Sequence, residues 1–123
     1  MPEQRPSGKA GPRPTDLRGC ANELRAAAAF LLCGWEVFWP ASYSSPVDFM
    51  AVQEEVAARV QVKSAHTTPA GTFRVHTAAH KYGPASFDIL VAVCPDGSVW
   101  SAHWKTTYKR KTLTLKADMH QML

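Results

Sequence analysis

Two runs of strand-forming residues, separated by only two residues, constrain this chain more than any other feature. The first run spans residues 47–53, the second spans residues 56–65, and Glu54 and Glu55 lie between them. A two-residue connection joins antiparallel neighbours and determines which of their residues face each other. Counting outward from Gln53 opposite Val56, the pattern predicts that Asp48 lies opposite Gln61.

This register sorts the side chains of the two strands onto two faces. Side chains alternate along a strand, so Asp48, Gln61 and Lys63 are predicted to share one face. The other face is apolar and consists of Val47, Phe49, Val60 and Val62. Because Glu-Glu is poor chemistry for a primed turn, a bulge or a longer loop stays open as an alternative. Gln61 and Lys63 share a face in either case.

The polar face has the chemistry of a metal site. Magnesium prefers oxygen ligands, and Asp48 offers a carboxylate, Gln61 an amide oxygen and Val62 a main-chain carbonyl. A bound ion polarises a phosphate and lowers the pKa of a bound water. Lys63 is suited to orient or deprotonate that water and to stabilise developing negative charge. The hypothesis is hydrolysis of a phosphodiester bond, and the alternative for each residue alone is an ordinary structural position.

A helix is predicted from Thr15 or Asp16, either of which suits the N-cap, to about residue 33. Gly34 follows at the position where a C′ glycine belongs. The apolar stripe that we expect to be buried consists of Leu17, Ala21, Leu24, Ala28 and Leu31. Glu23 lies about 100° from Leu24 around the helix, and Gly19 leaves room beside it. Glu23 is therefore a fourth candidate ligand, and the alternative is a solvent-facing side chain.

The remaining strands are predicted at residues 35–39, 72–77, 87–94 and 98–104, and the apolar run 87–94 is expected to be buried on both faces. Together these elements predict an α/β fold with a central mixed sheet of four to five strands flanked by helices. We expect a flexible basic tail at residues 1–14, one domain at 15–104 and a basic extension at 105–123.

Several residues are candidates for contact with phosphate. Lys109, Arg110 and Lys111 follow Tyr108, and basic residues beside an aromatic ring suit phosphate contact and stacking. A solvated tail is the alternative for this segment. Ser64 and His66 directly follow the candidate lysine, with a strand end that runs into a loop as the alternative.

Composition adds only broad limits. The chain has 123 residues, with 14 basic and 10 acidic side chains and a net charge of +4, which suits a polyanionic partner. Three cysteines, an odd number, argue against a disulfide framework. No apolar run approaches the ~20 residues of a membrane span, and no secretory segment is evident. We therefore expect a cytoplasmic protein with no membrane contact and no small-molecule cofactor.

At these residues the sequence resembles the PD-(D/E)XK nuclease superfamily. The motif reads Pro46-Val47-Asp48 and then Gln61-Val62-Lys63, after a helix that carries Glu23 and a turn at residues 34–37. Residues 15–104 are covered by the resemblance. The chain is similar to group I intron homing endonucleases of this type, in which Gln occupies the acidic position, and to archaeal Holliday junction resolvases.

The resemblance implies a restriction-endonuclease-like core and a DNA substrate. It implies Mg²⁺ as the cofactor, with Mn²⁺ as the alternative ion, and an active-site quartet of Glu23, Asp48, Gln61 and Lys63. It also implies a homo-oligomer, and the small size of the chain favours a dimer or a tetramer. Gln61 departs from the usual acid and removes one negative charge. A Holliday junction resolvase and a non-catalytic DNA-binding module therefore stay open as alternatives.

Overall fold

A mixed six-stranded sheet organises the computed structural model, which describes residues 14–42, 45–77, 79 and 81–123. The strand order is β1-β2-β3-β6-β7-β9, in which β3 and β6 are parallel and the other neighbours are antiparallel. The strands are β1 (Glu36–Phe38), β2 (Phe49–Gln53), β3 (Val56–Ser64), β6 (Ile89–Val93), β7 (Val99–His103) and β9 (His120–Gln121). The predicted mixed sheet is confirmed, with six strands instead of four to five.

The β2–β3 hairpin has the predicted register. Gln53 pairs with Val56, and the ladder ends where Phe49 pairs with Val60. Glu54 adopts a positive φ of 54°, which a two-residue primed turn requires. Phe49 and Val60 are fully buried, and a slip of one residue would turn the side chain on the displaced strand toward solvent. Core burial therefore holds the register although Glu-Glu is poor turn chemistry.

Helix α1 (Pro14–Leu32) confirms the predicted helix, although it begins before both of the predicted caps. Thr15 and Asp16 lie in its first turn, so neither is the N-cap. Gly34 has a φ of 90°, as expected for a glycine that ends a helix in the left-handed region. A Cβ at Gly34 would also lie 3.1 Å from the side-chain nitrogen of Gln53.

The face of α1 that was predicted to be buried is the exposed one. Leu17, Leu24 and Leu31 are 56%, 62% and 57% exposed. The buried face instead consists of Asn22, Ala26, Ala27, Ala29 and Phe30. Small alanines bring the helix close to the sheet, and the Phe30 ring packs edge-on against Phe49 with centroids 5.4 Å apart. Apolar residues occupy both faces, so periodicity alone selected the wrong one.

Two hydrophobic cores lie on the two faces of the sheet. The core beneath α1 includes Phe30, Phe49 and Val91. The other core includes Leu90 and Trp104, and β6 is therefore buried on both faces as predicted. Val47 packs against this second core, so its predicted place with Phe49 is wrong. The β2–β3 ladder ends at Phe49, and strict alternation of side chains ends with it.

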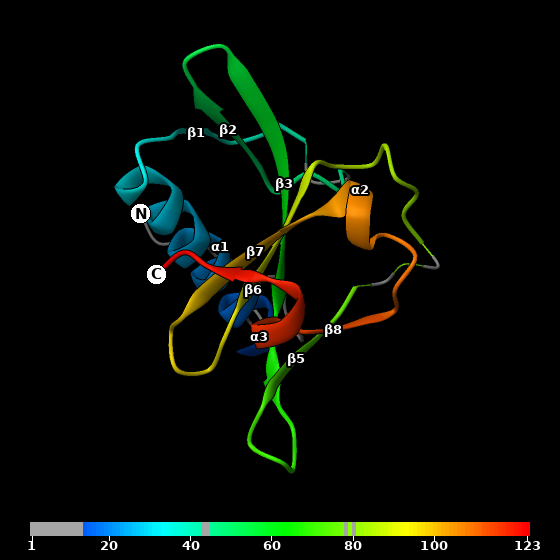
Figure 1. Cartoon of the computed structure of the whole chain (residues 1–123). Helices are drawn as coiled ribbons and strands as arrows, with labels where there is room; N and C mark the ends of the chain where they lie inside the picture. The colour runs from blue at the N-terminus through cyan, green and yellow to red at the C-terminus, as the bar shows by residue number, and fades with distance from the viewer. Residues whose placement is uncertain (1–13, 43–44, 78, 80) are drawn as a thin grey trace, which may run out of the picture.

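A second, three-stranded sheet and two short helices supply the second core. They are β4 (His66–Thr67), β5 (Phe73–His76), β8 (Thr112–Thr114), α2 (Trp104–Thr107) and α3 (Leu115–Asp118). In Figure 1 the β2–β3 hairpin projects from one end of the molecule, and the loop before β5 projects from the other.

Residues 105–123, which were expected to be a basic extension, contribute to this folded body. Strand β8 pairs with β5, and β9 pairs with β7 at the edge of the main sheet. Leu113, Leu115 and Met119 are buried. The basic tail predicted at residues 1–14 lies outside the described residues except for Pro14. Within the described part of the chain, no helix has the combination of length and apolarity needed to cross a bilayer.

Candidate active site

Asp48 lies one residue beyond the end of the β2–β3 ladder. Its main-chain N–H donates to the carbonyl of Val60 at 2.8 Å, and its Oδ2 accepts the main-chain N–H of Val62 at 2.6 Å. Burial raises the pKa of the Asp48 carboxyl, while the Val62 hydrogen bond and the charge of Lys63 oppose that rise. The carboxylate is thus held beside β3 by the middle residue of the predicted Gln61-Val62-Lys63 segment.

Gln61 continues the register opposite Asp48 and is 8% exposed. Its Oε1 is the buried side-chain oxygen that lacks a hydrogen-bond partner among the described residues. Burying an amide oxygen without a partner costs ~1–3 kcal/mol, so such an atom calls for an explanation. A bound cation that coordinates oxygen would provide the missing partner for Gln61 Oε1.

Glu23 lies on the inward side of α1, in the same turn as the buried Asn22 and Ala26. Together with Asp48 it lines a cavity of about 330 Å³, whose other walls come from Trp39, Pro40, Ser42, Ser45 and Val47. Burial and then the negative charge of Asp48 raise the pKa of the Glu23 carboxyl. The structure therefore brings the two predicted carboxylates within electrostatic reach of each other.

Lys63 lies two residues after Gln61 on the same face of β3, where it pairs with Ala92 of β6. The positive charge of Lys63 lowers the pKa of the Asp48 carboxyl. The Lys63 Nζ also lies 6.0 Å from the centre of the Tyr82 ring, at the limit of a cation–π contact.

These donors fit a hard divalent cation. Two carboxylates with raised pKa values and an unpartnered amide oxygen are the groups that such an ion stabilises. Main-chain groups of one residue point to the same side of a strand, so the Val62 carbonyl lies on the Asp48 side with its N–H. Among the described residues no three His, Cys, Asp or Glu side chains cluster. A site here therefore depends on the oxygens of Gln61 and Val62.

Asn22 is a residue that the sequence patterns did not single out. Its side-chain nitrogen donates to the Ser64 hydroxyl at 2.7 Å and so ties α1 to the end of β3. Both residues adjoin candidate site residues, since Asn22 precedes Glu23 and Ser64 follows Lys63. The sequence carries no local signal for this bond, because 42 positions separate its ends.

The Asn22–Ser64 bond lies in the wall of a second cavity of about 450 Å³ that Arg18 and Arg25 also line. Ser64 was predicted to contact phosphate, and its hydroxyl already serves Asn22 in this structure. Ser64 shares this cavity with two arginines, and its contact with phosphate stays a prediction.

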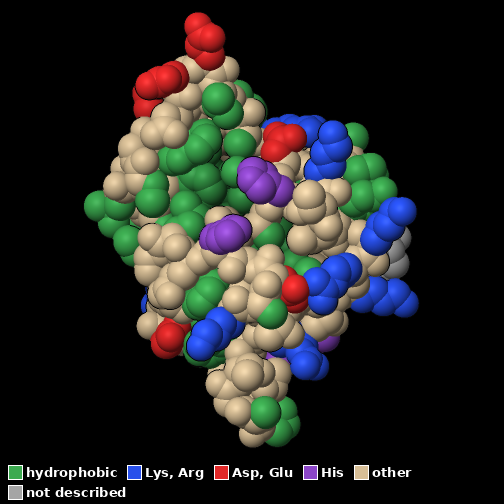
Figure 2. Space-filling view, viewed as in Figure 1, with side chains coloured by type: hydrophobic (Ala, Val, Ile, Leu, Met, Phe, Trp, Pro, Cys, Tyr) green, Lys and Arg blue, Asp and Glu red, His purple; other side chains and the backbone are tan. Residues whose placement is uncertain are grey.

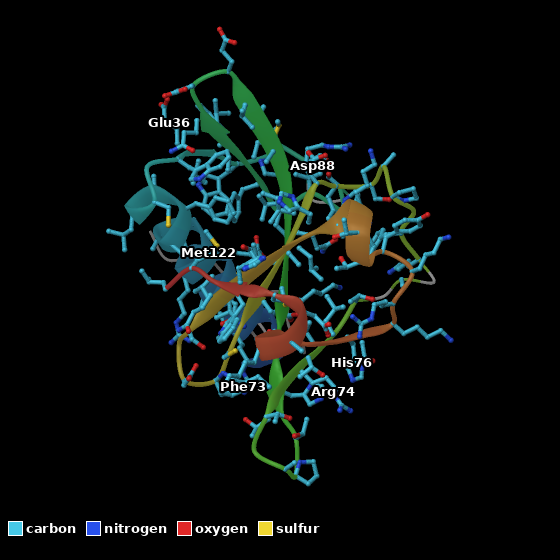
Figure 3. The ribbon with its side chains drawn as sticks, viewed as in Figure 1. Glu36, Phe73, Arg74, His76, Asp88 and Met122 are labelled. Carbon is cyan, nitrogen blue, oxygen red and sulfur yellow. The ribbon has the colours of Figure 1, made fainter. Side chains whose placement is uncertain are left out.

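The other candidates for phosphate contact lie in the second sheet and the loop before it. The His66 ring stacks on His76 with centroids 5.0 Å apart, and His66 pairs with Arg74 across β4 and β5. Figure 3 shows Arg74 and His76 at the opposite end of the molecule from Asp88. His76, on which the His66 ring stacks, pairs with Thr112 of β8, the residue that directly follows Lys111.

Arg110 differs from its two exposed neighbours because it already has an acidic partner. Its Nη1 contacts Oδ1 of Asp118 at 2.6 Å, and this guanidinium lowers the pKa of Asp118. Lys109 lies over the Tyr108 ring, with its Nζ 5.8 Å from the ring centre. Lys109 and Lys111 are exposed, which leaves both accessible to a polyanion.

Arg59 and Asp88 form an ion pair beside the site. The Arg59 Nε lies 3.1 Å from Oδ2 of Asp88, and the Arg59 main-chain N–H donates to the same oxygen at 2.8 Å. Arg59 lowers the pKa of Asp88 by these hydrogen bonds and by its charge. Asp88 therefore connects β3 to the start of β6 (Figure 3). Both of its carboxylate oxygens already accept hydrogen bonds from Arg59.

Comparison with known proteins identifies the family and the fold of the chain. Residues 14–102 match the family model described as PD-(D/E)XK endonuclease. A solved structure described as that of a bacterial homing endonuclease, I-Ssp6803I, is similar to this chain with a TM-score of 0.72. The two share 21% sequence identity over 84% of this chain and 78% of that one, so the likeness concerns the fold. No curated protein matches the chain in sequence.

Proposed function

The chain belongs to the PD-(D/E)XK endonuclease family, and from that premise we propose that it hydrolyses phosphodiester bonds of DNA with the help of a divalent metal ion. Mg²⁺ is the ion that we propose, with Mn²⁺ as a substitute, because the donors are oxygens. The family supports nuclease activity. The dependence on a metal ion and the DNA substrate are parts of the proposal.

One observation carries the proposal. The side-chain oxygen of Gln61 is buried without a partner, across the hairpin from a carboxylate whose pKa is raised by burial. Glu23 adds a second carboxylate with a raised pKa, and it lines the same cavity as Asp48. Burying an unpartnered oxygen or a carboxylate costs free energy, and a cation bound between these groups would offset that cost. This is why Gln61 supports a working site despite its neutral charge.

Each residue has a distinct proposed role. Glu23, Asp48, Gln61 and the Val62 carbonyl hold the ion, which supplies Lewis-acid activation of the phosphate and of a water when bound. Val62 fixes the orientation of Asp48 through the 2.6 Å hydrogen bond. Lys63 orients the attacking water, accepts or directs its proton, and stabilises the negative charge on the phosphoryl oxygens.

The kind of DNA substrate is a finer proposal. We favour a homing-endonuclease-like activity on duplex DNA, because the fold is similar to that of I-Ssp6803I and a Gln occupies the acidic position. Activity on four-way junctions is the second candidate. A DNA-binding module without catalysis is the third, and it predicts metal-independent DNA binding and no cleavage.

Plasmid cleavage tests the proposal. Supercoiled plasmid and a labelled four-way junction are incubated with wild-type protein and Mg²⁺ or Mn²⁺, with a chelator as the metal control. Lys63→Ala should lose nicking by a factor of ~10²–10⁴, the usual contribution of a group that transfers a proton or stabilises charge. Lys81→Ala is the matched control, because the Lys81 Nζ lies 5.9 Å from the same Tyr82 ring, whereas Lys81 belongs to a turn and not to β3.

The outcomes separate the candidates. Metal-dependent nicking by wild type and Lys81→Ala, but not by Lys63→Ala, supports the nuclease. Cleavage confined to the junction favours the resolvase. Binding without cleavage on either substrate overturns the proposed function in favour of a binding module.

A further inference from the structure

Trp39 is an exposed aromatic residue beside the two candidate carboxylates. It is 51% exposed and lines the cavity of about 330 Å³ that Glu23 and Asp48 also line, which we call the carboxylate cavity. All four tryptophans lie in the described part of the chain, and Trp39 is the one that is exposed. Trp100 and Trp104, by contrast, donate their indole N–H groups to oxygens of the protein.

The ring of Trp39 is held in place from inside the protein. It packs edge-on against Phe49, with ring centroids 5.6 Å apart and an angle of 64° between the ring planes. Phe49 is fully buried and therefore provides a fixed support. Pro40 follows Trp39 directly, and a residue before proline has a restricted backbone. The exposed part of the ring is thus presented in a limited range of orientations, which lowers the entropy cost of binding a flat ligand.

The walls of the carboxylate cavity differ in chemistry. Glu23 and Asp48 supply the charged part, and a cation that offsets their charge would allow a phosphate to approach them. Trp39, Pro40 and Val47 supply an apolar part, which offers no hydrogen-bond donor from an apolar side chain to a phosphate except the indole N–H. The face of a nucleobase suits such a wall, because every base has a π face that stacks on an aromatic ring.

We propose that Trp39 stacks on a nucleobase of the DNA strand whose phosphate lies at the two carboxylates. This inference rests on the proposed nuclease function and adds a requirement on the substrate. Bases inside a duplex are already stacked on their neighbours, so the base that Trp39 contacts must first leave the stack. The preferred substrate is therefore DNA with an unpaired base at the bound position. A fully paired duplex binds more weakly, because it must extrude a base.

Phe38 provides a matched control for Trp39. It is 53% exposed and directly precedes Trp39, but it pairs with Met50 of β2 and is not among the described walls of the carboxylate cavity. Figure 2 shows hydrophobic side chains gathered on the side of the molecule where β1 and β2 lie in Figure 1. Exposure of an apolar side chain is thus common in this region, and its place beside the carboxylates distinguishes Trp39.

Binding of a dye-labelled oligothymidylate to the full chain tests the stacking. The parent protein carries Lys63→Ala, so that the strand stays intact in Mg²⁺. Adding Trp39→Ala should weaken binding by ~5–150-fold, the usual contribution of one base stacked on an aromatic ring. Trp39→Phe should restore most of the affinity, and Phe38→Ala should bind as the parent does. Unchanged affinity in Trp39→Ala, or an equal loss in Phe38→Ala, overturns the proposal.

The salt dependence of binding separates stacking from a phosphate contact. Stacking involves no charge, so Trp39→Ala should keep the slope of log K against log salt concentration, whereas loss of one phosphate contact would reduce that slope by ~0.7. Circular dichroism verifies that each variant is folded. A reduced slope in folded Trp39→Ala protein contradicts stacking as the cause of the lost affinity.

A duplex with a central bubble of unpaired thymines tests the requirement on the substrate. The parent should bind it more tightly than the fully paired duplex, and Trp39→Ala should lose that preference. Equal binding of the two duplexes by the parent overturns the requirement for an unpaired base. These measurements need no cleavage, so Trp39-dependent binding by a chain that cuts no plasmid would overturn the nuclease function and support the stacking.

Discussion

Asp48 accepts the main-chain N–H of Val62 at 2.6 Å, so a carboxylate takes the hydrogen bond that a peptide carbonyl would accept if the ladder continued. The bond joins the two halves of the sequence motif through the backbone. It orients the Asp48 side chain before any ligand arrives, because Val62 is held in turn by its pairing with Val91. Preorganisation of this kind lowers the cost of assembling a metal site.

Asp48→Asn should stabilise the metal-free protein at neutral pH and abolish stabilisation by metal. Burial raises the pKa of Asp48, so the folded state binds this proton more tightly than the unfolded state does. Ionisation therefore costs stability as pH rises from the unfolded pKa through the raised, folded pKa. Asn removes the charge and still accepts the Val62 N–H. Thermal unfolding with and without Mg²⁺ or Ca²⁺ checks this, and a metal-induced gain in Tm that persists in the variant contradicts it.

Gln61→Met should also stabilise the metal-free protein, by about 1 kcal/mol, because it removes a buried oxygen that has no partner. The same change should reduce the Tm gain from Mg²⁺, since a thioether is a poor ligand for a hard ion. Gln61→Glu should act in the opposite direction, with a lower metal-free Tm and a larger gain from metal. Urea unfolding with a metal titration measures both effects. A destabilised Gln61→Met protein with unchanged metal binding would show that the amide serves the fold.

The carboxyl of Glu23 should titrate at lower pH in Asp48→Asn than in wild type. Burial is the larger cause of its raised pKa and remains in the variant, whereas the charge of Asp48 is removed. NMR titration of the carboxyl carbons measures the change, and Asp88, whose pKa is governed by Arg59, provides the unchanged reference. An unaltered Glu23 titration would separate the two carboxylates and weaken the shared metal site.

For the wild-type enzyme, the same raised pKa values predict that cleavage declines with acidification at a higher pH than ordinary carboxyl groups would cause. Protonated Glu23 and Asp48 no longer ligate the ion, so the loss should be partly reversed by added metal. Rates measured from neutral to acidic pH at low and high Mg²⁺ check this. A profile that does not respond to the metal concentration argues against ligand protonation as its cause.

Asp88→Ala should cost stability by ~1 kcal/mol, with little effect on cleavage, since Asp88 holds Arg59 by both its side chain and its main-chain N–H. Arg59→Ala should cost less, because the main-chain bond to Asp88 survives. Arg59 lowers the pKa of Asp88, so this contribution is present above the unfolded pKa and is lost as pH falls through the folded pKa. Urea unfolding at neutral and acidic pH, run as a double-mutant cycle, measures it. Equal losses at both pH values would contradict the assignment.

The local sequence determined the register of the hairpin. A two-residue connection leaves little freedom of register, and the alternation of side chains then brings Gln61 and Lys63 to one face of β3. Gly34 likewise ends α1 for a purely local reason, its left-handed backbone. These interactions join residues that are close in the chain, so the local pattern of residue types predicts them.

The tertiary structure alone decided which side of α1 is buried. Leu17, Leu24 and Leu31 form the more hydrophobic stripe, yet they are exposed. The alanine side of α1 packs on the sheet, because its small side chains let the helix backbone approach Phe49 closely. The same choice turned Glu23 inward to Asp48 and Asn22 to Ser64. Hydrophobic periodicity predicts that a helix has an apolar face. When a helix has two apolar faces, the shape of the surface that the helix packs against determines which face is buried.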